Sequence, residues 1–292
     1  MLTPESCDLL KPAFPKQKDF DDLLQKLDEN KVEQDDLMSS DIFIQTVGCI
    51  LGYQERLDSI IFKNEYKDMS NNILKLIEVF YICFDQIIEN EHFNKFLEII
   101  LAHGNYLNGI TMRGGAFGFK LTSLTKFAEM KTKDNKSNLL NFIVEFIIDD
   151  LKQPEILDFL SLLQKFKELE IQPIIEATGN LNLKFKKVVT LKELCEKKKN
   201  ELEEGDKTEE FISTFFEHAQ KTMNLLQESI EEIHSKYNNV AKFFGETPQT
   251  MTEDTFIKIM KQFYQDLYHS MEAYKKMKDS RDKKNKKKIK KK

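Results

Sequence analysis

The sequence predicts an all-α protein, and three observations support this fold class. Apolar residues recur at intervals of three and four along most of the chain, which places them on one face of an α-helix. Only 10 glycines and 6 prolines occur in 292 residues, so few tight turns are available. No segment alternates apolar and polar residues strongly enough to predict a strand. Hydrophobic residues make up 40% of the chain, which is enough for a sizeable core.

The first third of the chain is expected to hold a series of helices. Residues 1–16 contain three of the prolines and are expected to form turns. Beyond them, apolar residues at helical spacing predict helices at these positions: 20–27, 41–64, 70–89 and 93–101. Ser70 or Asn71 is expected to cap the third helix, because short polar side chains favour helix N-termini.

A glycine-rich segment, residues 104–118, is expected to interrupt the helices, since five of the ten glycines fall in it. A phosphate-binding loop is excluded because no strand precedes the glycines and no Gly-Lys-Ser/Thr ending follows them. An ordinary connection between helices remains an alternative. After this segment the pattern predicts helices near 121–130 and 135–151, the second with Asp134 as its N-cap.

The most regular pattern in the chain covers residues 212–244, beyond interruptions at Pro154 and Pro173. Its apolar residues are spaced alternately four and three apart: Ile212, Phe216, Ala219, Met223, Leu226, Ile230, Ile233, Tyr237, Val240 and Phe244. This heptad seam predicts one helix roughly 50 Å long. We expect it to pack within its own chain, with pairing to another molecule as the alternative. Gly245 is placed as a C-cap, and a final helix is expected from about residue 252.

The chain carries no motif of catalysis or metal binding. The five histidines lie in different segments, and the four cysteines form no CxxC pair. Neither HExxH nor GxSxG occurs. We therefore expect no enzymatic activity, no metal and no cofactor. The longest purely apolar run, residues 79–84, is too short to span a membrane and no leader is recognised, so a cytoplasmic protein is expected.

Charge is distributed unevenly along the chain. The net charge is −5, yet residues 275–292 hold 12 basic and 2 acidic side chains, so this segment carries +10 and the remainder carries −15. An acidic body argues against a nucleic-acid partner, which would favour a basic face. The basic segment is expected to be a disordered tail.

A run of specific residues beginning at Leu101 resembles the signature of the formin homology 2 domain. The matching stretches are Gly104-Asn105-Tyr106-Leu107-Asn108, Phe117-Gly118-Phe119-Lys120-Leu121, Asp134-Asn135-Lys136 and Leu139-Leu140-Asn141-Phe142. Further similarities lie at Leu2-Thr3-Pro4-Glu5, Tyr53-Gln54-Glu55-Arg56-Leu57 and Phe243-Phe244-Gly245-Glu246. The resemblance therefore extends over almost the whole chain.

The resemblance implies an elongated helical domain with a knob, a coiled-coil section and a post. Residues 1–274 are expected to be a partial domain of this kind, followed by the basic tail at 275–292. The family's lasso, linker and first knob helices have no counterpart, and the absence of Trp agrees with this. The implied function is actin binding, filament nucleation and barbed-end elongation at the actin cytoskeleton. The alternative is a truncated actin- or formin-binding module that does not nucleate, and a monomer or weak dimer is expected.

The resemblance also implies two sets of site residues. The post surface that would receive the lasso of another formin chain comprises Gly104, Asn105, Tyr106, Asn108, Gly118 and Phe119. Lys131 matches the family's actin-contacting post lysine. Further lysines lie within 17 residues of one another and form a local positive patch with it: Lys120, Lys126, Lys133 and Lys136. A solvated helix face is the alternative for this patch.

The lysine-rich end resembles the basic stretch that follows the domain in formins. It could contact actin, an acidic phospholipid or a nuclear import receptor, since clustered lysines attract anionic surfaces. A purely solubilising role is the alternative.

Overall fold

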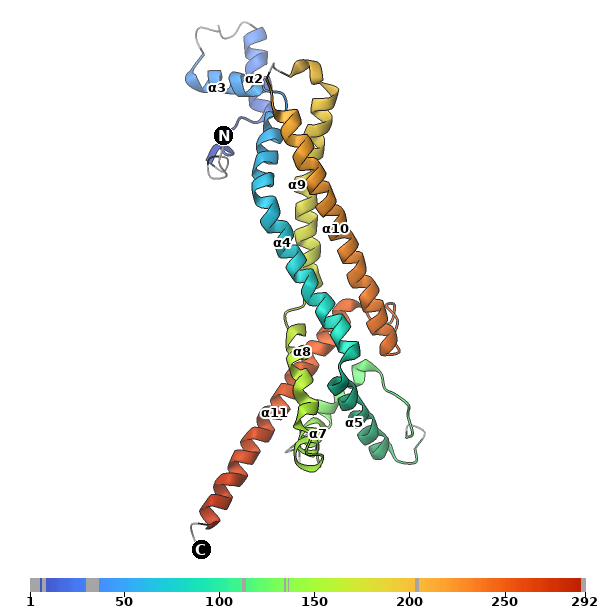
Figure 1. Ribbon diagram of the computed structural model, residues 1–292. Helices are drawn as coiled ribbons and strands as arrows, with labels where there is room; N and C mark the ends of the chain where they lie inside the picture. Colours follow the sequence, from blue (N-terminus) through green and yellow to red (C-terminus); the bar gives the residue numbers. More distant parts are fainter. Residues whose placement is uncertain are drawn as a thin grey trace. The chain divides into compact units, whose positions relative to one another are not determined.

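The computed structural model describes residues 6, 9–29, 37–111, 114–133, 135, 137–202 and 205–289 (Figure 1). The predicted all-α class is confirmed: regular structure in these ranges is helical, apart from one isolated antiparallel bridge between Lys131 and Asn138. The chain forms two compact units, and both are discontinuous in sequence. Unit 1 comprises residues 1–75 and 173–229, and unit 2 comprises residues 76–172 and 230–292.

Unit 1 is a bundle of long helices with a smaller helical pair before it. Its elements are α2 (Gln17–Asp28), α3 (Ser39–Gly48), the first part of α4 (Tyr53–Glu89), most of α9 (Ile171–Lys197), η5 (Lys199–Glu201) and the first part of α10 (Thr208–Phe243). Phe62 and Tyr66 of α4 meet Phe215 of α10 edge-on, each at 5.6 Å between ring centroids. Phe185 of α9 stacks on Phe216 of α10. Aromatic contacts thus join the three long helices of unit 1.

Unit 2 contains the shorter helices and the last long one. Its elements are the end of α4, α5 (Glu91–Asn108), η2 (Leu121–Ser123), α6 (Lys126–Glu129), α7 (Leu139–Glu145), the π-helix η3 (Phe146–Asp150), η4 (Pro154–Phe159), α8 (Leu160–Phe166), the end of α10 and α11 (Glu253–Ile289). Helix α11 packs against α7 and α8. Phe96 of α5 lies between Phe159 and Phe263, with centroids 5.0 and 5.9 Å away. An aromatic core therefore holds α5 and α11 together.

The heptad seam is helical and is buried by its own chain, as expected. Seven of its members are buried: Ile212, Ala219, Met223, Leu226, Ile233, Tyr237 and Val240. At one position the neighbour takes the core place, because Phe215 is buried while Phe216 is half-buried against Phe185. Gly245 has a φ of 68° and its amide donates to the Lys242 carbonyl at 3.0 Å, which confirms the C-cap.

Helix α4 differs from the expected pair of helices, since it continues without a break from Tyr53 to Glu89. Ser70 does not cap a helix. Its hydroxyl donates to the Lys67 carbonyl at 3.1 Å, and its side chain is buried. The apolar stripe runs on through Ile73 and Ile77, each 2% exposed. Burial of this stripe outweighs the weak preference of serine for helix ends.

The predicted helices at 121–130 and 135–151 are wrong in extent. The first is split into η2 and α6, and the second begins only at Leu139, where the Asn138 side chain accepts from the Asn141 amide at 2.8 Å. Asp134 lies outside the described residues. Asn135 has a φ of 56°, a left-handed conformation that asparagine tolerates and that interrupts a helix. Helix α7 then widens into the π-helix η3.

Helix α11 also differs from expectation, because it extends to Ile289 through the segment expected to be a disordered tail. No glycine or proline occurs between Glu253 and Ile289, and lysine is a good helix former. The division of the chain at residue 274 remains a prediction. In the described ranges no helix is both long and apolar enough to cross a membrane.

Candidate functional site

The glycine-rich segment forms a loop that is fastened back to the helix it leaves. The Asn105 side chain donates to the Ala116 carbonyl at 2.9 Å and accepts from the Ala116 amide at 2.8 Å. Gly109 ends α5 with a φ of 54°. A Cβ on Gly114 would lie 1.8 Å from the Gly109 carbonyl oxygen, so the chain crosses itself closely here. The shape of the loop therefore requires glycine at positions 109 and 114.

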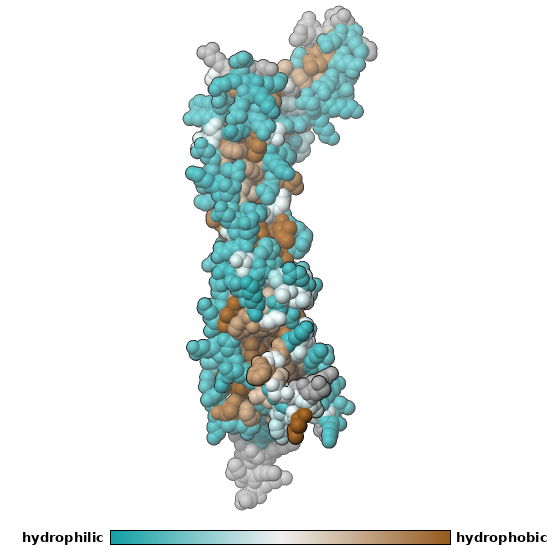
Figure 2. All heavy atoms as spheres, turned by 90° about the vertical axis from the view of Figure 1, so that its right-hand side faces the viewer, coloured by the Kyte–Doolittle hydropathy of each residue, from teal (hydrophilic) through white to brown (hydrophobic). Residues whose placement is uncertain are grey.

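Large apolar side chains project from this region into solvent. Ile110 and Phe117 are fully exposed, Tyr106 is 85% exposed and Leu107 is 56% exposed. Figure 2 shows one face of the molecule on which apolar residues gather in patches among hydrophilic ones. Scattered apolar residues are ordinary on a protein surface, but several together at the end of α5 and in the loop after it make this region a candidate binding surface.

An open groove of about 620 Å³ lies between the end of α5 and the start of α7. Its apolar lining includes Tyr106, Met130 and Phe142. The His103 ring stands edge-on to Phe142 and Phe146, with centroids 5.7 and 5.0 Å away, and its Nδ1 lies 2.8 Å from the Ile99 carbonyl oxygen. The wall of the groove is thus held in place by ring contacts and can accept an apolar side chain from a partner.

Lys131 lies at the edge of this groove, on a turn that the backbone fixes. The Thr132 amide donates to the Ser137 carbonyl at 2.9 Å, and the Leu139 amide donates to the Met130 carbonyl at 2.9 Å. These bonds flank the bridge between Lys131 and Asn138. The Lys131 side chain is exposed. Its place is therefore set by the backbone while its charge stays in solvent.

The other predicted lysines border neighbouring hollows. Lys126 borders a hollow of about 310 Å³ beneath the loop, together with Gly104 and Gly118. Lys120 borders another of about 640 Å³, together with Phe117. Like Lys131 and Lys133, both are exposed, and none of the four forms an ion pair with a carboxylate of the described residues. Lys136 lies outside the described residues.

The six residues expected to receive a lasso divide into two groups. Asn105 and Phe119 have structural duties, since the Asn105 amide fastens the loop and the Phe119 ring meets Phe127 edge-on at 6.0 Å. The positions of Gly104 and Gly118 are open, because an added Cβ would meet no atom within 4 Å, and the side chains of Tyr106 and Asn108 are exposed. Their part in a chain–chain contact remains a prediction.

Sequence reasoning did not single out Ile110 and Phe142 as exposed. Ile110 is fully exposed and Phe142 is 49% exposed. For Ile110 a signal existed, because an isoleucine inside a glycine-rich loop has no helical stripe to join. Phe142 carried no such signal, since its helix buries Leu140, Ile143 and Val144 and leaves Phe142 beside the groove.

The geometry is that of a binding surface. Among the described residues no group of histidine, cysteine and carboxylate side chains could hold a metal ion. Burial raises the pKa of the Cys83 thiol to about 12, which keeps this side chain protonated and unreactive.

Comparison with known proteins points to one family. The model of the formin homology 2 domain matches residues 1–268. The Disheveled-associated activator of morphogenesis 2 of Gallus gallus is 28% identical over 266 residues, covering 90% of this chain and 24% of that protein. Protein diaphanous of Drosophila melanogaster is 28% identical over 243 residues, covering 82% and 22%. Formin-F of Dictyostelium discoideum is 30% identical over 226 residues, covering 76% and 18%.

The chain thus spans about a quarter of the length of the curated relatives it matches. The family match covers both units and includes the glycine loop, the turn at Lys131 and the long helices α4, α9 and α10. The recognition made from the sequence motifs is confirmed. This chain belongs to the formin homology 2 family, whose domains bind actin and are not enzymes.

Proposed function

We propose that this domain binds actin through the surface around the glycine loop and promotes filament nucleation and elongation at the barbed end. The observation that carries the proposal is the set of exposed lysines without described acidic partners: Lys120, Lys126, Lys131 and Lys133. Lys120, Lys126 and Lys131 border hollows with apolar linings in a chain whose net charge is −5. Actin is acidic, so its long-range approach requires a local positive surface.

Lys131 is the best single residue with which to test this proposal. It lies beside an apolar groove, so an acidic group of actin docked there would be partly desolvated. Lys131→Glu is expected to weaken binding by roughly 1–3 kcal/mol, which is about 5- to 150-fold in Kd, and Lys131→Ala by less. The fold should be unaffected, because the side chain is exposed and makes no described ion pair.

The experiment is co-sedimentation with actin filaments at two salt concentrations. Lys258→Glu is a matched control, since Lys258 is an exposed lysine of α11 in the same unit and is remote in sequence from the loop. Wild type and control should bind alike, with a Kd that rises with salt. If Lys131→Glu binds as well as Lys258→Glu, the lysines are a solvated face and the proposed site is wrong.

Nucleation is tested separately from binding. Assembly of pyrene-labelled actin should start sooner in the presence of the chain if it nucleates filaments. Binding without faster assembly would support the alternative, a formin-like actin-binding module that does not nucleate.

A segment of another formin chain is proposed to occupy the open space at Gly104 and Gly118, where an added Cβ would meet no atom. Sedimentation velocity with a lasso-bearing formin homology 2 chain tests this, and Gly104→Leu should abolish the complex.

The lysine-rich end of α11 is proposed as an additional contact for an acidic partner. Helix α11 continues to Ile289, and four lysines near its end have exposed side chains: Lys275, Lys276, Lys278 and Lys283. A flotation assay with vesicles distinguishes a lipid surface from a protein partner. If the partner is a lipid surface, the chain should float with vesicles that contain phosphatidylserine and not with vesicles that lack it.

A further inference from the structure

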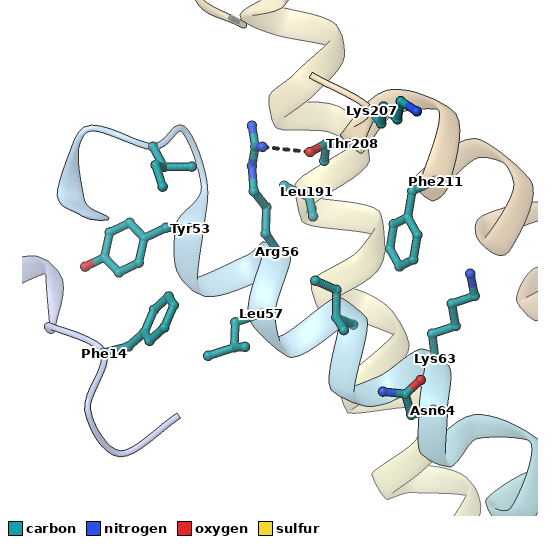
Figure 3. Close-up of a pocket in the computed structure, with 12 residues that line it drawn as sticks. Phe14, Tyr53, Arg56, Leu57, Lys63, Asn64, Leu191, Lys207, Thr208 and Phe211 are labelled. Carbon is teal, nitrogen blue, oxygen red and sulfur yellow. Dashed lines mark hydrogen bonds between the residues drawn. The ribbon is translucent and has the colours of Figure 1, made fainter. Parts of the chain in front are cut away.

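Unit 1 contains an apolar groove of about 510 Å³ that the actin proposal does not use. Its walls come from the segment before α2, from α4, from the end of α9 and from the start of α10 (Figure 3). Leu57 and Leu191 are buried at its base. Phe14 and Ile60 pack against the core beneath it and remain half-buried, and Ile50 is 42% exposed at its edge. The groove is therefore an apolar surface open to solvent.

Hydrogen bonds hold the walls of this groove in place. The Tyr53 hydroxyl donates to the Pro15 carbonyl at 2.9 Å, which fixes the segment carrying Phe14. The Arg56 guanidinium donates to the Thr208 hydroxyl at 2.6 Å and forms an ion pair with Asp206 at 2.7 Å. Figure 3 shows Arg56 reaching from α4 to Thr208. The charge of Arg56 is thereby neutralised, and α4 is tied to the start of α10.

Two other cations line the groove, and neither has an acidic partner among the described residues. Lys63 and Lys207 line it, are exposed, and form no ion pair with a described carboxylate. The Lys63 ammonium stands 4.4 Å from the centroid of the Phe211 ring, which keeps the charge beside the apolar surface. Four other lysines of unit 1 do have an acidic partner: Lys11 and Lys187 pair with Asp58, Lys184 with Glu65, and Lys199 with Glu209.

The long direction of the groove follows a helix. On α4 the lining residues recur about one turn apart, from Tyr53 through Leu57 and Ile60 to Asn64. The eleven helical steps from Tyr53 to Asn64 correspond to about 16 Å, or three turns. A partner helix lying along this stripe would place residues i, i+3 or i+4, and i+7 in the groove, which is a common mode of peptide recognition.

We propose that this groove binds an amphipathic helix of a partner protein, with apolar residues on the inner face and acidic residues on the flank that meets Lys63 and Lys207. The apolar lining supplies affinity, and the charges of Lys63 and Lys207 supply the choice of partner. The site belongs to unit 1, so it is independent of the glycine loop.

The proposal can be tested with labelled synthetic helical peptides of 16 residues. One panel carries leucine, phenylalanine or methionine at i, i+3, i+4 and i+7 with flanking glutamates, and a twin panel carries lysines in place of the glutamates. Fluorescence anisotropy with the full chain should show binding of members of the glutamate panel and at least tenfold weaker binding of their lysine twins. Ile50→Asp should weaken the glutamate panel by a similar factor.

The double variant Lys63→Glu/Lys207→Glu should reverse the preference, so that the lysine panel binds more tightly than the glutamate panel. Lys186→Glu, an exposed lysine of α9 in the same unit, is the matched control and should leave both panels unchanged. Circular dichroism verifies that each variant is folded. Equal binding of the two panels, or no binding of either at 1 mM peptide, would overturn the proposal. Self-association that Ile50→Asp abolishes would also overturn it, because a second copy would then be the occupant.

Discussion

The aromatic contacts of unit 1 and the glycine loop of unit 2 use similar side chains in opposite ways. Phe62 is 1% exposed and meets Tyr66 and Phe215 at 5.6 Å, whereas Phe117 is fully exposed. Both are phenylalanines in a chain that contains 23 of them. Burying such a side chain is worth about 1.5–3 kcal/mol, so leaving it in water forfeits a large stabilisation.

The difference lies in what the backbone around each ring can do. Residues of α4 share a stripe that faces α10, so a periodic pattern buries all of them together. The glycine loop has no periodic backbone, and Asn105 fastens it only by two hydrogen bonds to Ala116. Its apolar side chains are therefore left exposed to solvent. The aromatic contacts of unit 1 explain stability, and the glycine loop of unit 2 is the candidate for binding.

The largest expected effect is on stability in unit 1. Phe62→Ala should lower the free energy of unfolding by about 3–5 kcal/mol, because it removes a fully buried ring and leaves a cavity. Phe117→Ala is the matched comparison in the loop and should change it by less than about 0.5 kcal/mol. Urea denaturation followed by circular dichroism measures both. Equal losses for the two variants would end the distinction between a structural and a binding phenylalanine.

A second expected effect concerns alkaline pH. Burial, followed by the negative charges of Glu253 and Glu246, raises the pKa of Tyr237 from its ordinary 10.0 to about 12. Its hydroxyl donates to the Met251 carbonyl at 2.5 Å. The folded state thus favours the protonated phenol, whose contribution is fully present below pH 10 and is lost as the pH rises to about 12.

The loss corresponds to roughly 3 kcal/mol, from about two pKa units at 1.36 kcal/mol each. Unfolding free energies measured between pH 9 and pH 12 should fall less steeply in Tyr237→Phe than in wild type. Tyr237→Phe retains the ring that packs on Phe84 and Phe256, so a change in slope reports the hydroxyl alone. An unchanged slope would show that the buried seam does not control this titration.

The attachment of the loop gives a smaller effect. Asn105→Ala removes both hydrogen bonds to Ala116 and should cost about 1 kcal/mol per bond, mostly as local opening. Hydrogen exchange should therefore become faster around Ala116 and stay unchanged in α4. Asn105→Asp keeps the acceptor but loses the donor, so its exchange rate around Ala116 should lie between that of wild type and that of Asn105→Ala. Exchange as slow as in wild type would mean that the loop is held by other contacts.

Gly104→Ala is expected to have the smallest effect, and it should be stabilising. Gly104 lies within α5, and an added Cβ meets no atom within 4 Å. Replacing a helical glycine by alanine should raise the free energy of unfolding by about 0.5–1 kcal/mol. Gly114→Ala is the contrast, because its Cβ would lie 1.8 Å from the Gly109 carbonyl oxygen. A destabilising Gly104→Ala would imply that the chain itself occupies the space assigned to a partner.

Several features could be read from the sequence because they depend on local chemistry. The helical class and the seam of α10 follow from apolar spacing, and the C-cap at Gly245 follows from the need for a positive φ. The family was recognisable because its motif residues are contiguous along the chain. Lys131 was identified by that resemblance, and the lysines around it by their clustering in an otherwise acidic chain.

Other features were decided by tertiary packing. Ser70 is a helix-capping residue in isolation, yet it lies inside α4 because its hydroxyl is satisfied by Lys67 and the stripe on either side is buried. The Asn105 side chain can donate a hydrogen bond to the Ala116 carbonyl only because the loop brings Ala116 back beside α5. The apolar groove of unit 1, which Lys63 and Lys207 line, is formed by segments up to about 200 residues apart in sequence. Sequence alone determined the helical class and the seam of α10, because apolar spacing acts within a few residues. The extent of several helices and the exposure of individual side chains were decided only when distant segments packed together.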